Sequence, residues 1–222
     1  MAMKVLFSWS GGKDSVLALN ELKRFGDFDI VAFLTSFTEP FDRVSMHGVR
    51  RELLERQVSS LGFCLDKVFV PKNSSNEEYE RRMTIVLDKY AAMGVSGAVF
   101  GDIFLEDLRK YRETNLSKAN LSGIFPLWKK DTSELAGNFI DSGFKAVVVC
   151  VDSTVLGKHF AGREFDEKFL SELPGNVDPC GENGEFHTFV YDGPLFQQKV
   201  SFNRGMTVFK NKRFYFCDLL PA

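Results

Sequence analysis

Apolar runs rich in β-branched residues alternate with stretches of helical periodicity along the first two thirds of the chain. This alternation is typical of βαβ units, in which helices join parallel strands and cover the sheet. The runs predicted to be strands are KVLFSW, DIVAFLTS, LDKVFV, GAVFG, GIFPLW and KAVVVCV. The pattern predicts an α/β fold built on a doubly wound parallel sheet.

The predicted helices have recognisable ends. Glycine readily adopts the left-handed conformation that closes a helix. Five helix ends are predicted at Gly26, Gly62, Gly94, Gly123 and Gly143. Ser75 with Glu78, and Asp131 with Glu134, have the spacing of a capping box and predict two helix starts.

Beyond Val151 the pattern changes to one short helix, a turn-rich stretch and three alternating runs. The runs FHTFVYDG, QKVSFNRGMTVFK and RFYFCDLL predict strands, with turns at NRG and KNK. We therefore expect an α/β domain over residues 1–125 and a smaller C-terminal α+β domain over residues 126–222.

Composition narrows the class of partner. The 222 residues include 28 Lys and Arg against 30 Asp and Glu, so the formal net charge is −2. A chain without net positive charge is not drawn to polyanions, which disfavours nucleic acid as the main partner. The longest apolar run, AVVVCV, is too short to span a membrane. Four cysteines without a C-x-x-C pair indicate reduced thiols, so we expect a soluble cytoplasmic protein without a membrane partner.

The stretch SWSGGKDS, residues 8–15, joins the first predicted strand to the first helix and is called the phosphate loop below. It is not a Walker A loop, because Asp14 separates Lys13 from Ser15. It is not G-x-G-x-x-G either, because its two glycines are adjacent. Backbone N–H groups at a helix N-terminus form a concave set of donors, and the helix dipole adds positive potential. The loop therefore predicts binding of a diphosphate or pyrophosphate.

Each residue type in the loop has a physical role. Adjacent glycines let an oxygen approach the backbone closely, hydroxyls donate hydrogen bonds, and lysine supplies a charge. The nucleotide-binding candidates in the loop are Ser8, Ser10, Gly11, Gly12, Lys13, Asp14 and Ser15. For the carboxylate of Asp14, two roles stay open, binding of Mg²⁺ or capping of the helix.

Further candidates follow other predicted strands, where doubly wound sheets bind their ligands. Ser36 ends the second strand and is a nucleotide-binding candidate, and His47 follows it as a substrate-binding candidate. Arg50 begins a helix, where a cation opposes the dipole, so it either binds a substrate anion or forms a surface ion pair. Gly101 would let adenine or ribose approach, and Asp102 either binds ribose, metal or amine or caps a helix.

Residues 178–196, DPCGENGEFHTFVYDGPLF, concentrate titratable side chains among glycines. Zinc is disfavoured because no ligands occur in pairs at the usual spacing. If EFHTFVYDG is a strand, Glu185 and His187 share one face, an arrangement suited to holding an amine or moving a proton. A surface strand with outward polar side chains is the alternative.

Two motifs resemble known families. SGGKDS resembles the S-G-G-x-D-S loop of N-type ATP pyrophosphatases, the PP-loop superfamily. CGENGEFHTFVYDGPLF resembles the C-terminal signature of the diphthine–ammonia ligase family, C-G-E-x-G-E-[FY]-x-T-F-x-x-D-x-P-L-F. The resemblance implies a Rossmann-like fold of HUP type, an ATP-binding first domain and a second domain that completes the substrate cleft. Its substrate-binding candidates are Cys180, Glu182, Glu185 and Thr188.

The same resemblance implies an ATP-dependent carbon–nitrogen ligase. Such an enzyme adenylates a carboxylate, releases pyrophosphate and AMP, and adds ammonia or a small amine. ATP and Mg²⁺ are the expected cofactors, with Asp14 as the metal ligand and Lys13, Asp14, Glu185 and His187 as catalytic candidates. The expected partners are ammonia and a carboxylate on a small molecule or on a modified residue of a translation factor, and a homodimer is considered. The alternatives are a PP-loop enzyme that modifies RNA and a non-catalytic ATP-binding module.

Overall fold

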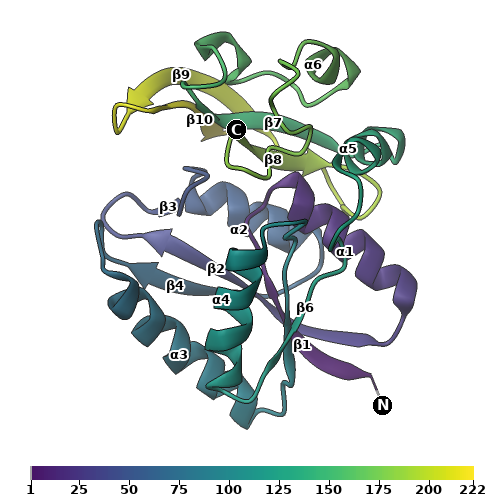
Figure 1. Ribbon diagram of the computed structural model, residues 1–222, viewed down its shortest axis with the longest axis vertical. Coiled ribbons are helices and arrows are strands. Elements are labelled where there is room, and N and C mark those ends of the chain that lie inside the picture. Colours follow the sequence, from purple (N-terminus) through teal and green to yellow (C-terminus); the bar gives the residue numbers. More distant parts are fainter. Residues whose placement is uncertain (1) are drawn as a thin grey trace.

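A mostly parallel sheet forms the first half of the molecule, which a computed structural model describes over residues 2–222 (Figure 1). Its strand order is β3-β2-β1-β5-β6, with β4 also paired to β2 and only β3 antiparallel. The strands are β1 (Met3–Ser8), β2 (Phe28–Thr38), β3 (Arg43–Val44), β4 (Leu65–Val70), β5 (Gly97–Val99) and β6 (Ser122–Ile124). Because the chain leaves β1 toward β2 on one side and returns as β5 on the other, the crevice for a ligand lies above β1.

Helices cover both faces of this sheet. They are α1 (Lys13–Phe25), α2 (Arg51–Ser60), α3 (Asn76–Ala92) and α4 (Glu106–Ser117). Successive side chains of β1 point to opposite faces. Phe7 accordingly shares a core with residues of α1 and α2, whereas Leu6 shares a second core with residues of α3 and α4. The predicted doubly wound α/β fold is confirmed.

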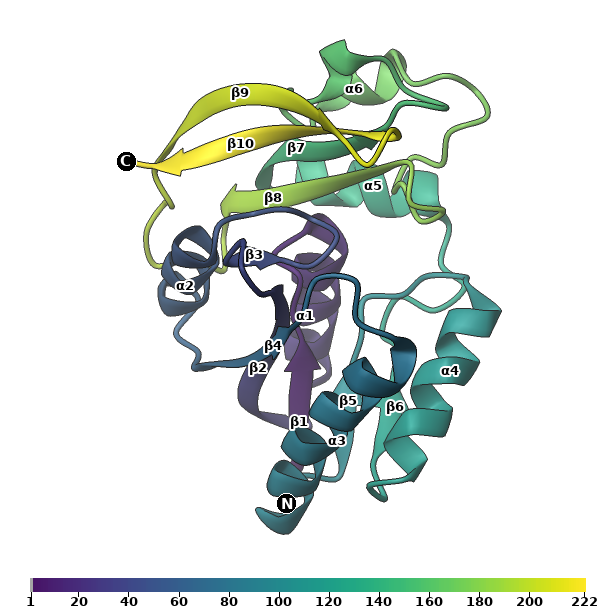
Figure 2. The same ribbon diagram turned by 90° about the vertical axis from the view of Figure 1, so that its left-hand side faces the viewer.

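A second, antiparallel sheet has the order β8-β7-β10-β9 and is accompanied by short helices. Its elements are α5 (Thr132–Asp141), β7 (Lys145–Asp152), a 3₁₀ turn (Lys158–Phe160), α6 (Glu167–Ser171), β8 (Phe186–Asp192), β9 (Phe202–Lys210) and β10 (Phe214–Pro221). In Figure 2 this sheet lies above the parallel sheet, with β8 as the strand nearest to α2 and to the start of α1. No helix within residues 2–222 is long and apolar enough to cross a membrane.

The two sheets share one hydrophobic core and several polar contacts. The core joins Leu54 of α2 to Phe189 and Val190 of β8. At its margin the Asp218 carboxylate accepts hydrogen bonds from Arg50, at 3.1 and 2.7 Å, and from Arg43, at 2.8 Å. The second sheet is therefore anchored to the first by packing and by a buttress of ion pairs.

Two local predictions are wrong. Gly123 does not end a helix but lies inside β6, because α4 ends at Ser117 and Asn120 takes the positive φ of 56°. NRG is not a turn, because β9 continues through it. The pairing of β9 with β10 shifts register between Cys217 and Leu219, and this bulge accommodates Gly205 within the ladder.

Asp218 predicts a pH-dependent stability. Burial alone would raise its pKa, but hydrogen bonds from Arg50 and Arg43 lower it to about 2 from 3.8. A pKa depressed in the folded state gives stability that is present above pH 4 and is lost as the pH falls toward 2. We expect Asp218→Asn to lower the free energy of unfolding by about 1–2 kcal/mol at pH 7, and by less at pH 3. Urea unfolding at both pH values measures this, and an equal loss at the two would contradict it.

Candidate active site

A cavity of about 340 Å³ opens between the C-terminal ends of the parallel strands and β8. This volume is within the range of small-molecule sites. It is lined by predicted residues from four separate segments: Ser8, Ser10, Lys13, Asp14, Ser15, Ser36, His47, Gly101, Asp102, Glu182, His187 and Thr188. The fold therefore brings most of the sequence-predicted candidates to one place.

The phosphate loop turns directly into α1. Gly11 has a φ of +80°, and a Cβ there would lie 2.5 Å from Cδ1 of Leu54, so glycine is required for both reasons. The first helical hydrogen bond runs from the N–H of Val16 to the carbonyl of Gly12, at 3.2 Å. The N–H groups of Asp14 and Ser15 precede it, as first-turn donors that a helix cannot satisfy itself. They are suitably placed for an anion above the loop.

Hydroxyl groups hold the loop in shape. The Oγ atoms of Ser10 and Ser15 lie 2.9 Å apart, and the N–H of Gly12 donates to Ser10 Oγ at 3.2 Å. These bonds close the loop into a compact turn whose hydroxyls line the cavity.

Lys13 is almost fully buried between the two domains. Its N–H donates to Thr188 Oγ1 at 3.0 Å, and its Nζ donates to the carbonyl of Cys180 and to Asp14 Oδ2. Burial is the largest single effect and opposes its charge, but Asp14, Cys180 and Glu182 together outweigh burial and raise the pKa of Lys13. A fixed positive charge therefore stands beside the loop.

Asp14 does not cap α1, so that one of its two predicted roles is wrong. The N-cap is Gly12, and no side chain bonds to the cap. Burial raises the pKa of Asp14, against the lowering effect of Lys13, and its Oδ1 has no hydrogen-bond partner within residues 2–222. No set of three or more side-chain metal ligands occurs in that range. One orphaned carboxylate oxygen still fits Mg²⁺, which takes one or two carboxylates together with phosphates and waters.

Two histidines from different domains stack in the cavity. The rings of His47 and His187 have centroids 4.5 Å apart and an interplanar angle of 29°. His47 Nδ1 lies 3.3 Å from the carbonyl of Thr188. Burial lowers the pKa of His47 to about 4 and that of His187 well below its usual value. Both imidazoles are therefore neutral at neutral pH.

Glu185 and Cys180 shape the loop before β8. Glu185 precedes the strand, and its Oε1 accepts from the N–H of Asp178 at 3.1 Å and from Asn183 at 3.0 Å. The thiol of Cys180 donates to the carbonyl of Thr132 at 3.3 Å, and burial raises its pKa. Neither side chain is among those that line the cavity. Glu185 thus contacts its own loop rather than forming the expected pair with His187.

Glu182 bridges the two domains at the cavity wall. Its Oε1 accepts hydrogen bonds from the N–H groups of Ile103, at 2.7 Å, and Phe104, at 3.4 Å. Burial is the largest effect on Glu182 and raises its pKa, and the like charges of Asp14 and Asp102 raise it further. The hydrogen bond from Ile103 opposes them, and the resulting pKa is about 7. This carboxyl group can therefore gain or lose a proton near neutral pH.

Asp102 and Gly101 differ in part from their predicted roles. Asp102 is not a helix cap, since α4 begins at Glu106; its carboxylate instead accepts from Arg112 at 2.5 and 3.1 Å. A Cβ on Gly101 would lie 2.8 Å from the backbone carbon of Asp14. The close approach that requires glycine at position 101 is therefore made by the first turn of α1.

Arg50 lies outside the cavity. Its guanidinium is bound by Asp218, and it is absent from the side chains that line the site. Of the two roles that the sequence left open for Arg50, anion binding or an ion pair, the structure shows the ion pair.

Two profiles of known protein domains match the chain, one over each of its two halves. Residues 3–120 match the profile described as diphthamide synthase N-terminal domain, and residues 131–218 match the profile described as diphthamide synthase C-terminal domain. The chain belongs to the diphthamide synthase family.

Curated relatives in this family carry the name diphthine–ammonia ligase. The protein from Danio rerio is 27% identical over 231 residues, which cover 93% of this chain and 89% of the relative. The one from Schizosaccharomyces pombe is 27% identical over 89% of this chain and 36% of the relative. The one from Bos taurus is 33% identical over 56% of this chain and 47% of the relative. The chain thus spans most of the length of the first relative and less than half of the length of the other two.

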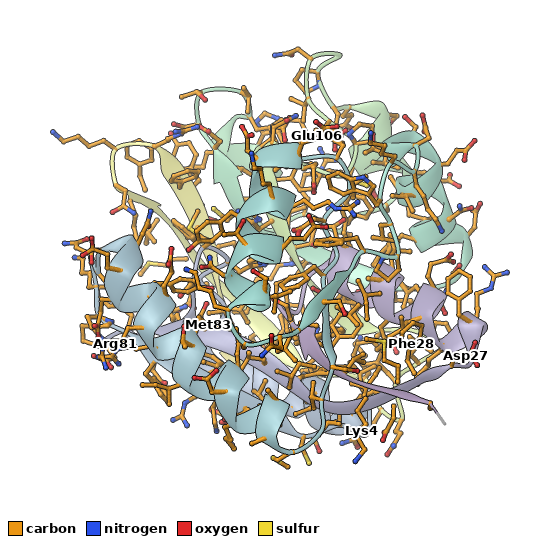
Figure 3. The ribbon with its side chains drawn as sticks, turned by 60° about the horizontal axis from the view of Figure 1, so that its bottom comes forward. Lys4, Asp27, Phe28, Arg81, Met83 and Glu106 are labelled. Atoms are coloured by element: carbon orange, nitrogen blue, oxygen red, sulfur yellow. The ribbon has the colours of Figure 1, made fainter. Side chains whose placement is uncertain are left out.

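Sequence reasoning missed an apolar extension of the cavity between α3 and α4. Leu34, Tyr79, Met83 and Phe100 line both the main cavity and this extension. Figure 3 shows Met83 on the inner side of α3, whereas Arg81 of the same helix lies at the outer edge. Helical periodicity alone cannot distinguish such a lining residue from an ordinary core residue.

Sequence reasoning also missed Gln57, although a signal was present. In RELLERQVSS it follows Leu53 and Leu54 at the spacing of the buried helix face. The side chain of Gln57 is fully buried beneath the phosphate loop. A polar residue at such a position must find partners inside the protein.

The packing at Gly101 gives a test of stability. We expect Gly101→Ala to destabilise the protein by about 1–3 kcal/mol, because the new methyl group overlaps the backbone of α1 and forces it to move. Gly137 in α5 has nothing within 4 Å of its Cβ position, so Gly137→Ala is the matched control. It should raise stability by about 0.5–1 kcal/mol through helix propensity. Thermal unfolding of both variants measures this, and equal shifts of the same sign would contradict the packing argument.

Proposed function

We propose that this chain is an ATP-dependent amide ligase that adenylates the carboxylate of diphthine, a modified residue of a translation factor, and joins it to ammonia. The phosphate loop at the start of α1, closed over by β8, is the observation that carries the proposal. The names of the family relatives support the substrate. A carboxylate that attacks the α-phosphorus of ATP would release pyrophosphate beside this loop.

The cavity suggests a direction for the nucleotide. Phosphates would lie against the N–H groups of Asp14 and Ser15, and the base would enter the apolar extension near Leu34 and Met83. Asp102 lines the main cavity and is bonded to Arg112, which lines both spaces, so its carboxylate would be within reach of the ribose. This orientation places the polar end of ATP on the helix terminus and its apolar base among apolar side chains.

Charge on the leaving pyrophosphate would be stabilised by groups that are already in position. The ammonium group of Lys13 is held by Asp14 and by the carbonyl of Cys180, and the N–H groups of Asp14 and Ser15 lie in the first turn of α1, so these donors would not need to reorganise. Asp14, with its orphaned oxygen, is the residue that would hold Mg²⁺ together with the phosphates. When bound, that ion would offset phosphate charge.

The second half-reaction needs a neutral nitrogen nucleophile. The lone pair of ammonia would attack the carbonyl carbon of the acyl adenylate, the bond from that carbon to the AMP oxygen would break, and the nitrogen would lose a proton. Glu182 lies on the cavity wall with a pKa of about 7, so we assign to it, rather than to His187, acceptance of the proton that ammonium loses before the attack. The stacked neutral imidazoles would instead line the acceptor side of the cavity.

The setting of the reaction is a further part of the proposal. The four cysteines are all free thiols, which fits a reducing cytoplasm. Homodimerisation remains a prediction.

Product analysis tests the proposed function. With ATP, Mg²⁺, ammonium and a diphthine-containing acceptor, we expect AMP and pyrophosphate. Ser15→Ala should lower turnover by about two orders of magnitude, the cost of losing one preorganised donor. Ser59→Ala, in α2 and exposed, is the matched control. Formation of ADP and phosphate would overturn the proposal, and ATP binding without AMP formation would favour a non-catalytic module.

The assignment of Glu182 has its own test. We expect Glu182→Gln to lower ammonium-dependent amide formation by about 10²–10⁴-fold, the usual contribution of a general base. Hydroxylamine is largely unprotonated at neutral pH, so it should restore much of the rate in the variant. Comparable losses with both nucleophiles would contradict a role in removing the ammonium proton.

A further inference from the structure

Gln57 joins three parts of the molecule that meet beneath the active site. Its Nε2 donates to the carbonyl of Gly11 in the phosphate loop, at 2.9 Å, and to the carbonyl of Val190 in β8, at 2.5 Å. Its Oε1 accepts from the indole N–H of Trp9 at 2.8 Å. The N–H of Val190 donates to the same Gly11 carbonyl at 2.9 Å. The loop and β8 are therefore connected both directly and through one carboxamide.

The phosphate loop rests directly on α2. A Cβ added to Gly11 would lie 2.5 Å from Leu54 Cδ1 and 2.9 Å from Gln57 Oε1. Trp9, whose indole Gln57 holds, also lines the cavity. The position of this helix and of its amide consequently limits where the loop backbone can lie.

An amide is well suited to this place. Gln57 has no exposed surface, so each polar group around it must be satisfied by a protein partner. A carboxamide supplies both donors and an acceptor without a charge. An apolar side chain would leave the indole N–H of Trp9 without the acceptor that Gln57 supplies, and it would remove one hydrogen bond each from the carbonyls of Gly11 and Val190; such losses are costly in the interior.

We propose that Gln57 is a positioning residue that holds the phosphate loop in register with β8. The inference rests on the proposed function, in which this loop binds the phosphates of ATP. Through Val190, the loop is tied to the strand whose Thr188 and His187 line the opposite wall. Gln57 thereby sets the distance between the nucleotide and the groups contributed by the second domain.

α2 provides a matched control for this role. Ser60 also bonds to the second domain, accepting from the N–H of Gln198 at 3.0 Å and donating to its carbonyl at 2.5 Å. These bonds do not involve the phosphate loop. Ser60→Ala therefore removes a domain contact of the same helix while leaving the loop and its amide in place.

The test compares Gln57→Met, Gln57→Glu and Ser60→Ala in ligase assays of the full chain. A displacement of about 1 Å can cost about a hundredfold in rate, so we expect Gln57→Met to lower kcat tenfold to a hundredfold. It should also raise the KM for ATP several-fold and leave the KM for ammonium unchanged. A buried glutamate is protonated and can donate one of the two lost bonds, so Gln57→Glu should recover part of the rate. Ser60→Ala should match the unmodified protein.

Binding gives a second measurement that does not depend on turnover. The chain has two tryptophans, so in a Trp128→Phe background the emission of Trp9 reports directly on ATP binding. Gln57→Met should weaken ATP binding in this assay. A loss of folded protein alone would lower kcat without moving the KM or the affinity for ATP.

The outcomes separate the two proposals. Failure of the unmodified protein to form AMP would remove the proposed function, while ATP binding would still report on Gln57. Wild-type affinity and KM for ATP in Gln57→Met would overturn the positioning role. If Gln57→Met does not fold, the same comparison made with Gln57→Glu decides, and wild-type values there would overturn the role as well.

Discussion

The seating of the phosphate loop on β8 is the contact on which the rest of the site depends. The carbonyl of Gly11 accepts a hydrogen bond from the N–H of Val190, and the N–H of Lys13 donates to the side-chain hydroxyl of Thr188, so the loop backbone is tied to β8 at two points. Both bonds are backbone interactions of the loop and are shielded from water. The shared core and the ion pairs of Asp218 hold the two sheets together, and these two bonds set where β8 lies relative to the loop and so form the second wall of the cavity.

Burial determines the protonation of the site more strongly than any single ion pair does. The ammonium of Lys13 stays charged because Asp14, at 3.0 Å, acts together with Cys180 and Glu182 against burial, while the two stacked imidazoles lose their charged forms to desolvation. Glu182, which is partly shielded and close to other carboxylates, titrates near neutrality instead. One cavity thus holds a permanent cation, two neutral rings and a proton acceptor, each in the state that its surroundings impose.

Ion pairs outside the cavity have a different role. Arg50 and Arg43 converge on Asp218 of β10, and α2 contributes Ser60 to the segment after β8. These contacts orient the second domain without reaching the ligand space. α2 can therefore support the phosphate loop through Gln57 and, at the same time, hold the second sheet through Ser60 and Arg50.

The sequence by itself determined the doubly wound sheet, most helix ends and the phosphate loop, because these depend on local periodicity and on residues adjacent in the chain. It also indicated the 178–196 segment, whose motif is contiguous. Only the tertiary structure decided the partners of Arg50, Asp102 and Glu185, since each could bond to a ligand or to the protein. The stacking of His47 on His187 and the bond of Gln57 to Val190 likewise join residues more than a hundred positions apart. Such pairings follow from how two domains dock, and no local pattern encodes that geometry.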